Sequence, residues 1–194
     1  SVAVWQPDRL WEGTAAAVRG ALKKLDCAPD VRGVAVTGFG SDAVPLDSRG
    51  NELFPFVSFY EKATIEQRDE YTKLIGDFES YSISGICPWY YLTLFRMMWL
   101  RKYFPLLFDK AAVWLNVTDY INYKLCGTAA TDYSEASTTI AFDQTALSWS
   151  EAILKKTGIP EDVFPRLLPA GTVLGTVAKE AAERTGLPEN TAVV

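Results

Sequence analysis

The sequence predicts an α/β domain in which short strands alternate with helices. Two observations support this fold class. Apolar residues recur at helical spacing over residues 8 to 25, and a nearly continuous apolar run follows from Val31 to Thr37. The 194 residues, 48% of them hydrophobic, are enough to bury one core. We therefore expect one domain, or one large lobe of a larger protein, with a mixed sheet and flanking helices.

The elements of the first half follow from local signals. Asp8 precedes the first amphipathic helix, which we expect to pack on the sheet. The strand from Val31 to Thr37 closes at Gly38, and residues 43 to 46 are expected to return beside it as a neighbouring strand after a tight turn. Residues 56 to 59 read as a short strand and residues 64 to 75 as a helix.

In the second half, residues 90 to 103 form a strongly apolar helix that ends before Pro105, and residues 111 to 115 form a buried strand. A helix from Asp119 should end at Gly127, and residues 132 to 139 are expected to form a loop of acidic and hydroxyl residues. Further helices are predicted near residues 148 to 157, 160 to 166 and 176 to 185. The chain ends in a strand at residues 191 to 194, so we expect the natural protein to continue beyond it.

Composition and charge exclude several kinds of partner. The net charge is −5 and the basic residues are scattered, which disfavours nucleic acid. Cys27, Cys87 and Cys126 are far apart and histidine is absent, so neither a zinc site nor a disulfide framework is expected. No apolar run reaches the roughly 18 residues of a membrane helix, and no signal peptide opens the chain. A cytoplasmic location without membrane contact is the expectation.

An ordered set of motifs spans nearly the whole chain. Its centre is an aspartate-led helix at Asp119, the ending Leu125-Cys126-Gly127, and the run from Asp132 to Thr139. Matching segments lie on both sides, namely residues 32 to 38, 46 to 50, 96 to 100, 149 to 150, 157 to 160, 171 to 175 and 185 to 188. In this order the motifs resemble the N-terminal domain of FGGY carbohydrate kinases.

The resemblance implies an actin-like (ribonuclease H-like) ATPase lobe, with residues 1–194 forming part of the N-terminal, sugar-binding domain. By the same resemblance, this sequence lacks the first phosphate-handling strand turn and the entire nucleotide lobe, and the catalytic aspartate is expected just beyond Val194. The implied reaction transfers the γ-phosphoryl group of ATP, with Mg²⁺, to a hydroxyl of a sugar or polyol. No residue of this chain is nominated as the catalytic base or as a metal ligand.

The resemblance also places substrate contacts. The turn after the strand at Val31 to Thr37 faces the sugar in the family, and its residue pair falls on Gly40 and Ser41, with Asp42 beside them. Glycerol kinases carry arginine and glutamate there, and xylulokinases methionine and histidine, so neither substrate transfers to this chain. The alternative is a plain hairpin turn. In a surface turn, replacing Ser41 by leucine should leave the fold intact.

A second predicted segment is Phe59 to Ala63, where many members read W-x-D-x-R. Glu61 keeps the acid, but Ala63 lacks the planar donor fork of arginine. Trp89 and Tyr90 align with an aromatic sugar contact, although aromatic residues at the start of an apolar helix often belong to the core. Among the acids, Asp42, Glu61 and Asp132 could contact substrate hydroxyls.

Two other classes stay open: a related actin-type ATPase without a sugar pocket, and a non-catalytic binding or scaffold domain. The matches from residue 149 to residue 187 argue against the first, and the length of the parent gene separates the second from a kinase. The sequence leaves the sugar unidentified. It also leaves open whether the protein is a homodimer.

Overall fold

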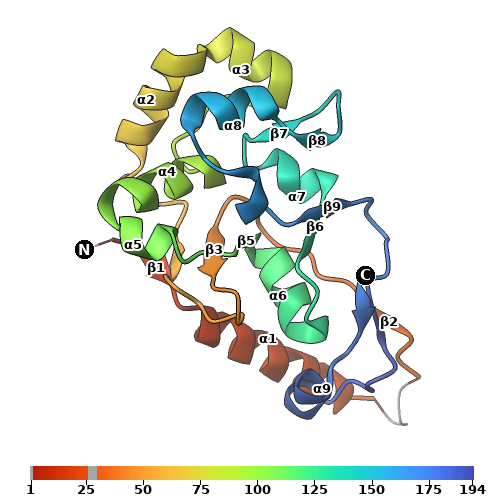
Figure 1. Cartoon of the computed structure of the whole chain (residues 1–194). Helices are drawn as coiled ribbons and strands as arrows, with labels where there is room; N and C mark the ends of the chain where they lie inside the picture. The colour runs from red at the N-terminus through yellow and green to blue at the C-terminus, as the bar shows by residue number, and fades with distance from the viewer. Residues whose placement is uncertain (1, 26–29) are drawn as a thin grey trace.

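The computed structural model describes residues 2–25 and 30–194, and Cys27 lies outside these ranges. Two hydrophobic cores organise the molecule (Figure 1). One core is built around α4 (Thr93–Tyr103), with α2 (Ile65–Ile75) and α8 (Glu151–Thr157) against it. The other lies between α1 (Pro7–Leu22), α6 (Val117–Cys126) and α9 (Lys179–Thr185). All six predicted helices around these cores are present, with ends shifted by a few residues.

The strands form small sheets. In one sheet β11 (Ala192–Val193) lies between β2 (Gly33–Val34), to which it is parallel, and β10 (Gly175–Thr176), to which it is antiparallel. A second parallel pair joins β6 (Ala130–Asp132) to β9 (Arg166–Leu168). Antiparallel pairs join β1 (Val4–Trp5) to β4 (Phe56–Val57) and β7 (Phe142–Asp143) to β8 (Ser148–Trp149). Because β2 and β11 are parallel, the carboxyl ends of both strands lie at the same edge of the sheet.

The predicted pairing of residues 43 to 46 with the preceding strand is wrong. These residues form β3 (Ala43–Leu46), as expected, but β3 pairs antiparallel with β5 (Val113–Asn116), which places Ala43 opposite Asn116. All four residues of β3 are buried, and β5 supplies the apolar neighbour that this burial needs. Residues 38 to 42 are therefore a link between two sheets, which also rules out the plain hairpin turn.

The aspartate-led helix is present, and its end at Gly127 is confirmed, but it begins two residues before Asp119. Helix α6 begins at Val117, and Gly127 follows it with φ of 76°, a left-handed conformation that glycine adopts without steric cost. The Gly127 N–H donates to the carbonyl of Tyr123 at 2.7 Å.

The predicted loop at residues 132 to 139 is largely helical instead. Strand β6 leads into the short helix α7 (Tyr133–Ser137), because Asp132 caps it. Its Oδ1 accepts hydrogen bonds from the backbone N–H groups of Ser134 at 2.7 Å and Glu135 at 2.9 Å. The prediction of a loop rested on the hydroxyl-rich composition and did not take this helix cap into account.

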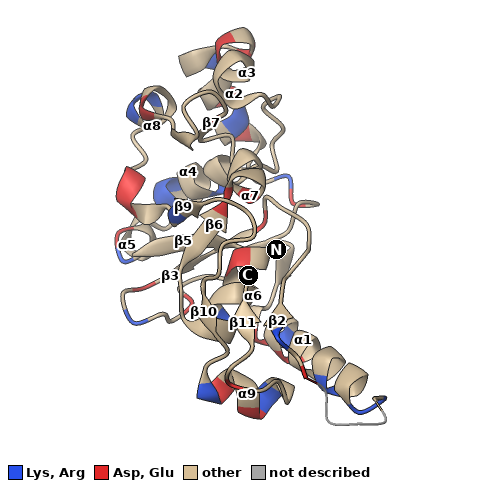
Figure 2. Cartoon of the chain, turned by 90° about the vertical axis from the view of Figure 1, so that its right-hand side faces the viewer, with Lys and Arg blue, Asp and Glu red and all other residues tan. Residues whose placement is uncertain are grey.

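Three further elements complete the chain. Helix α3 (Asp77–Ser84) was not predicted, α5 (Pro105–Phe108) starts at the proline that ends α4, and the region near residues 160 to 166 contains the 3₁₀ turn η1 (Glu161–Val163). Lys and Arg residues are spread over helices at both ends of the molecule (Figure 2). Within the described ranges, no helix combines the length and apolarity that crossing a bilayer requires.

Candidate functional site

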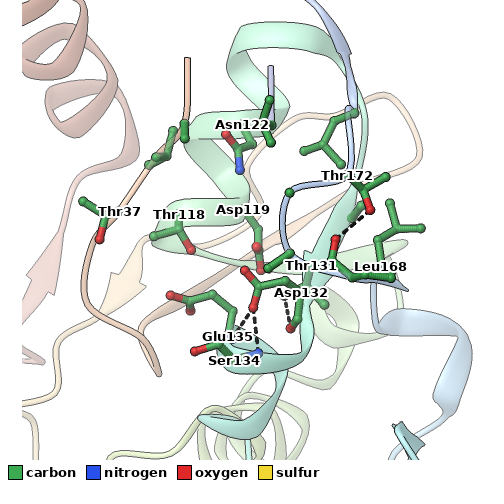
Figure 3. Close-up of a pocket in the computed structure, with 18 of the residues that line it drawn as sticks. Thr37, Thr118, Asp119, Asn122, Thr131, Asp132, Ser134, Glu135, Leu168 and Thr172 are labelled. Carbon is green, nitrogen blue, oxygen red and sulfur yellow. Dashed lines mark hydrogen bonds between the residues drawn. The ribbon is translucent and has the colours of Figure 1, made fainter. Parts of the chain in front are cut away.

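A cavity of about 430 Å³ lies at the edge where β2 and β11 end (Figure 3). Ligands of α/β proteins commonly bind beyond the carboxyl ends of parallel strands, and the volume suits a small molecule. The walls come from the ends of the two strands, from α6, from β6 with α7, and from the segment after β9. The lining residues are Ala35, Val36, Thr37, Gly38, Thr118, Asp119, Asn122, Ala130, Thr131, Asp132, Ser134, Glu135, Leu168, Pro169, Ala170, Gly171, Thr172, Leu174 and Val194.

Three carboxyl groups line this cavity. Asp119 is 4% exposed, and burial raises its pKa well above the usual range, with Glu135 and Asp132 adding to the rise and Thr131 opposing it. Burial also raises the pKa of Glu135. Asp132 commits Oδ1 to the α7 cap. A protonated Asp119 can donate a hydrogen bond, whereas an ionised carboxylate only accepts.

Buried polar atoms without partners lie beside these acids. Neither Thr118 Oγ1 nor Asn122 Oδ1 has a hydrogen bond to any described residue. The Thr118 hydroxyl is near enough to Glu135 to lower the pKa of that carboxyl, yet the two groups do not meet in hydrogen-bond geometry. Because an unpaired buried polar group is costly, these atoms indicate a place where a ligand can bind.

Asn116 holds Glu135 in position. Its Nδ2 lies 3.2 Å from Glu135 Oε2, 3.3 Å from the Glu135 carbonyl and 3.3 Å from Thr138 Oγ1. Its Oδ1 accepts a bond from the hydroxyl of Thr93 on α4, at 3.2 Å. The carboxylate at the cavity wall is thus connected to the buried helix α4.

The predicted substrate turn at Gly40 and Ser41 is fastened to the end of α7. The Ser41 N–H donates to Thr138 Oγ1 at 3.0 Å, and Ser41 Oγ donates to the Thr138 carbonyl at 3.2 Å. Gly40 is in close contact with the same side chain, since an added Cβ would lie 2.6 Å from Thr138 Cγ2. The turn follows directly on Thr37 and Gly38, which line the cavity, but Gly40 and Ser41 are not among the lining residues.

Ser41 is not the surface residue that the sequence suggested. It is 6% exposed and has φ of 72°, a region that bulky L residues avoid. The premise of a surface turn is therefore wrong, and we now expect leucine at this position to destabilise the fold, because its side chain would be buried against Thr138 on a strained backbone. Strained backbone of this kind is frequent at functional sites.

Asp42 is fully buried and forms an ion pair with Arg96 of α4 at 2.7 Å. Its Oδ2 accepts further bonds from Trp5 Nε1 at 2.9 Å and from the Phe59 N–H at 3.2 Å. Arg96 also donates to the carbonyls of Ser41 and Val57, both at 2.9 Å. The protein itself supplies donors to both Asp42 oxygens, so this side chain holds the turn, and its role as a substrate contact stays a prediction.

Burial dominates the titration of this pair. It raises the pKa of Asp42, opposed by Arg96, Trp5 and Phe59, and it lowers the pKa of Arg96 to about 10, opposed by Asp42. At neutral pH Arg96 keeps its proton. The three donors around Asp42 need acceptor lone pairs, so the ionised carboxylate is the form that fits this network.

The other predicted contacts lie outside the cavity. Glu61 accepts the backbone N–H groups of Ala3 at 2.6 Å and Ala63 at 2.9 Å, and these bonds lower its pKa. The Tyr90 carbonyl accepts the Thr64 hydroxyl at 2.6 Å. Trp89 is 56% exposed and stacks on Tyr91, with ring centroids 6.4 Å apart. Residues 59 to 61 adjoin the turn through the Asp42–Phe59 bond, but a sugar contact at these positions remains untested.

Sequence reasoning missed most of the cavity. It named Asp132 as an acid for substrate hydroxyls, but it treated Asp119 only as the start of a helix and did not single out Thr118, Asn122 or Glu135. One signal was available: Arg96 interrupts an otherwise apolar stretch of α4, and Asp119 stands close to the apolar residues Val117, Tyr120 and Ile121 of α6. Buried charges are rare without a partner or a role.

Comparison with known proteins matches residues 1–194 to the model for the N-terminal domain of the FGGY family of carbohydrate kinases. Among curated relatives, an L-fuculokinase of Escherichia coli K12 is 37% identical over 164 residues, covering 84% of this chain and 35% of the relative. An L-fuculokinase of Salmonella typhi is 31% identical over 191 residues, covering 98% and 40%. A xylulose kinase of Bacillus subtilis is 30% identical over 171 residues, covering 86% and 33%.

Solved structures agree on the fold. A xylulose kinase from Rhodospirillum rubrum superposes with a TM-score of 0.92 at 24% identity, covering 99% of this chain and 40% of the other. A gluconate kinase from Lactobacillus acidophilus gives 0.91 at 16% identity, covering 100% and 39%. The chain thus has the actin-like fold of these kinases, and it spans between 33% and 40% of the length of the relatives described here. The chain belongs to the FGGY family of carbohydrate kinases.

Proposed function

We propose that this chain is the sugar-binding lobe of an ATP-dependent kinase that phosphorylates a hydroxyl of a sugar or polyol. The observation that carries the proposal is the match of the family model over residues 1–194. Relatives named L-fuculokinase and xylulose kinase support it, and L-fuculose is the first candidate because the 37% identical relative is an L-fuculokinase.

The charges of the cavity favour substrate over nucleotide at this lobe. Three acids line it, and its described lining residues include no Lys, Arg or His. A triphosphate would meet repulsion from Asp132 and Glu135, whereas neutral hydroxyl groups can donate to these carboxylates and accept from a protonated Asp119. Recognition and orientation of the acceptor sugar is therefore the work that we assign to these residues.

ATP and Mg²⁺ would then be held mainly by residues beyond this chain. Across the described residues no group of three or more His, Cys, Asp or Glu side chains is arranged to hold a metal ion. We assign no residue of this chain as a Mg²⁺ ligand or as the catalytic base. The catalytic aspartate is expected beyond Val194, which borders the cavity.

The location and assembly of the protein are also proposals. A cytoplasmic location is consistent with the dependence of the proposed reaction on ATP, and a homodimer would be revealed by the solution mass of the longer protein. The division into domains, with this chain as part of the N-terminal lobe, rests on coverage of no more than 40% of the relatives described above.

The test is a phosphorylation screen of the full-length protein. ADP release is coupled to NADH oxidation for L-fuculose, D-xylulose, glycerol and D-gluconate, and the product is verified as a sugar phosphate by mass spectrometry. We expect sugar-dependent ADP release with at least one of these compounds. Reactions without sugar and without ATP serve as controls. ATP hydrolysis that no sugar stimulates would instead favour another actin-type ATPase, and no binding of ATP would favour a scaffold.

A further inference from the structure

The cavity at the ends of β2 and β11 combines an acidic lining with buried polar atoms that lack partners. Thr118 is 4% exposed, lines the cavity, and has no hydrogen bond from its hydroxyl to any described residue. Asn122, one turn further along α6, leaves its Oδ1 in the same condition. Figure 3 shows both side chains, with Asp119, around one space. We propose that this cavity, which the proposed function assigns to the acceptor sugar, selects neutral sugars and polyols against anionic sugars such as sugar acids.

The first step of the argument is hydrogen-bond matching. Asn122 Oδ1 and an ionised Glu135 need donors, while the hydroxyl of Thr118 and a protonated Asp119 can donate. A sugar hydroxyl donates and accepts at once, so a row of hydroxyls can satisfy such a mixed set. An alkyl or aromatic ligand of the same size would leave these buried groups unpaired.

The second step is charge. Asp132 and Glu135 line a cavity whose described lining includes no Lys, Arg or His. The Asp132 side chain cannot rotate out of the cavity without breaking the hydrogen bonds by which its Oδ1 caps α7. The Glu135 carboxyl group is held by a hydrogen bond from Asn116. A ligand carboxylate would be desolvated close to fixed carboxyl groups without a counter-charge, and like-charge contacts of this kind discriminate strongly between ligands.

This inference rests on the proposed function for the identity of its ligands, but its test measures binding and does not depend on turnover. The full-length protein is titrated by calorimetry with L-fuculose and D-xylulose as neutral probes and with D-gluconate as the anion. We expect at least one neutral sugar to bind and gluconate to bind more than about 10-fold weaker, a factor that corresponds to about 1.4 kcal/mol.

Matched variants locate the effect. Thr118→Val removes the unpartnered hydroxyl without changing side-chain shape, and it should weaken the neutral sugar about 5- to 10-fold, the usual effect of one lost hydrogen bond. Thr185→Val is the control: Thr185 is buried on α9, donates to the Ala181 carbonyl at 2.7 Å and lies outside the cavity lining. Its affinity for sugar should equal that of the parent. Glu135→Gln should reduce the difference in affinity between the neutral sugar and gluconate.

Several results would overturn the inference. Gluconate binding as tightly as the neutral sugars would do so, as would no loss of affinity in Thr118→Val, or equal losses in both threonine variants. Binding of none of the probes would also count against it. These outcomes differ from failure of the proposed function, since sugar binding that follows the predicted pattern without phosphorylation would refute the kinase assignment and leave the ligand class standing.

Discussion

Replacing Arg96 by methionine should destabilise the protein by about 3 to 5 kcal/mol, because Asp42 would stay buried without its counter-charge. Methionine is similar in length and apolar, so it fills much of the volume that the arginine occupies. The change therefore tests charge and hydrogen bonding more than packing.

The magnitude follows from the contacts of Arg96. It donates to Asp42 Oδ1 at 2.7 Å and to the carbonyls of Ser41 and Val57 at 2.9 Å. The Ser41 carbonyl keeps the hydroxyl of Thr93, 2.9 Å away, whereas the Val57 carbonyl loses the side-chain donor that Arg96 provides, which costs about 1 to 3 kcal/mol when no other donor replaces it. Asp42 can limit the loss by taking up a proton, since burial already raises its pKa.

The assay is urea unfolding of the full-length protein, followed by tryptophan fluorescence, to which Trp5 beside Asp42 contributes. Lys156→Met is the control, because its pair with Glu79 is solvent-exposed and should contribute less than about 1 kcal/mol. In the double variant Arg96→Met with Asp42→Asn, about 1 kcal/mol or more of the loss should be recovered, because the unpaired charge is gone.

The reasoning about the buried pair would be refuted by an Arg96→Met variant as stable as the Lys156→Met control. It would also be refuted by additive effects of the two changes at positions 42 and 96, since groups in direct contact are expected to couple.

Three further predictions follow from the site and the proposal. Ser41→Gly should lose only about 1 kcal/mol, for the bond from its hydroxyl to Thr138, whereas Ser41→Val should lose clearly more because φ is 72°; equal urea midpoints would contradict the strain argument. Because burial raises the pKa of Asp119, its contribution to stability is present below the unfolded pKa of 3.8 and is lost as the pH rises through the folded pKa. The stability of Asp119→Asn relative to the parent should therefore increase between pH 4 and pH 8, and a difference in urea midpoint that stays constant would oppose this. The 194-residue chain alone should not phosphorylate L-fuculose or D-xylulose in the coupled assay, because the proposed reaction needs phosphate contacts and a base from outside it; robust turnover would contradict the assignment as one lobe.

Local signals in the sequence were enough to place the main helices. Helix α6 was predicted from its apolar spacing and from Gly127, and both features act within a few residues of one another. Strand β3 was likewise bounded correctly. Its partner was not, because β5 lies about 70 residues away and no local pattern encodes that pairing.

The candidate site was harder to predict, because polar residues in a sequence usually indicate an exposed position, whereas several polar residues of this site are buried. Asp42 follows a glycine-rich turn, which suggested an exposed acid, yet Arg96 from α4 reaches it in the core. The run from Asp132 to Thr139 has the composition of a loop, and its helix depends on a single capping carboxylate. Both cases depend on contacts that form only when the chain folds.

Helix α7 has only five residues, and it connects the cavity lining with the turn at Gly40 and Ser41. Its first turn presents Asp132, Ser134 and Glu135 to the cavity, and the residue after its end, Thr138, holds the backbone of Ser41. So short a helix has little intrinsic stability, and its order depends on its ends. Occupancy of the cavity should therefore slow amide exchange in α7 and, through Thr138, in the Gly40–Ser41 link as well, so that ligand binding and local folding become a single equilibrium.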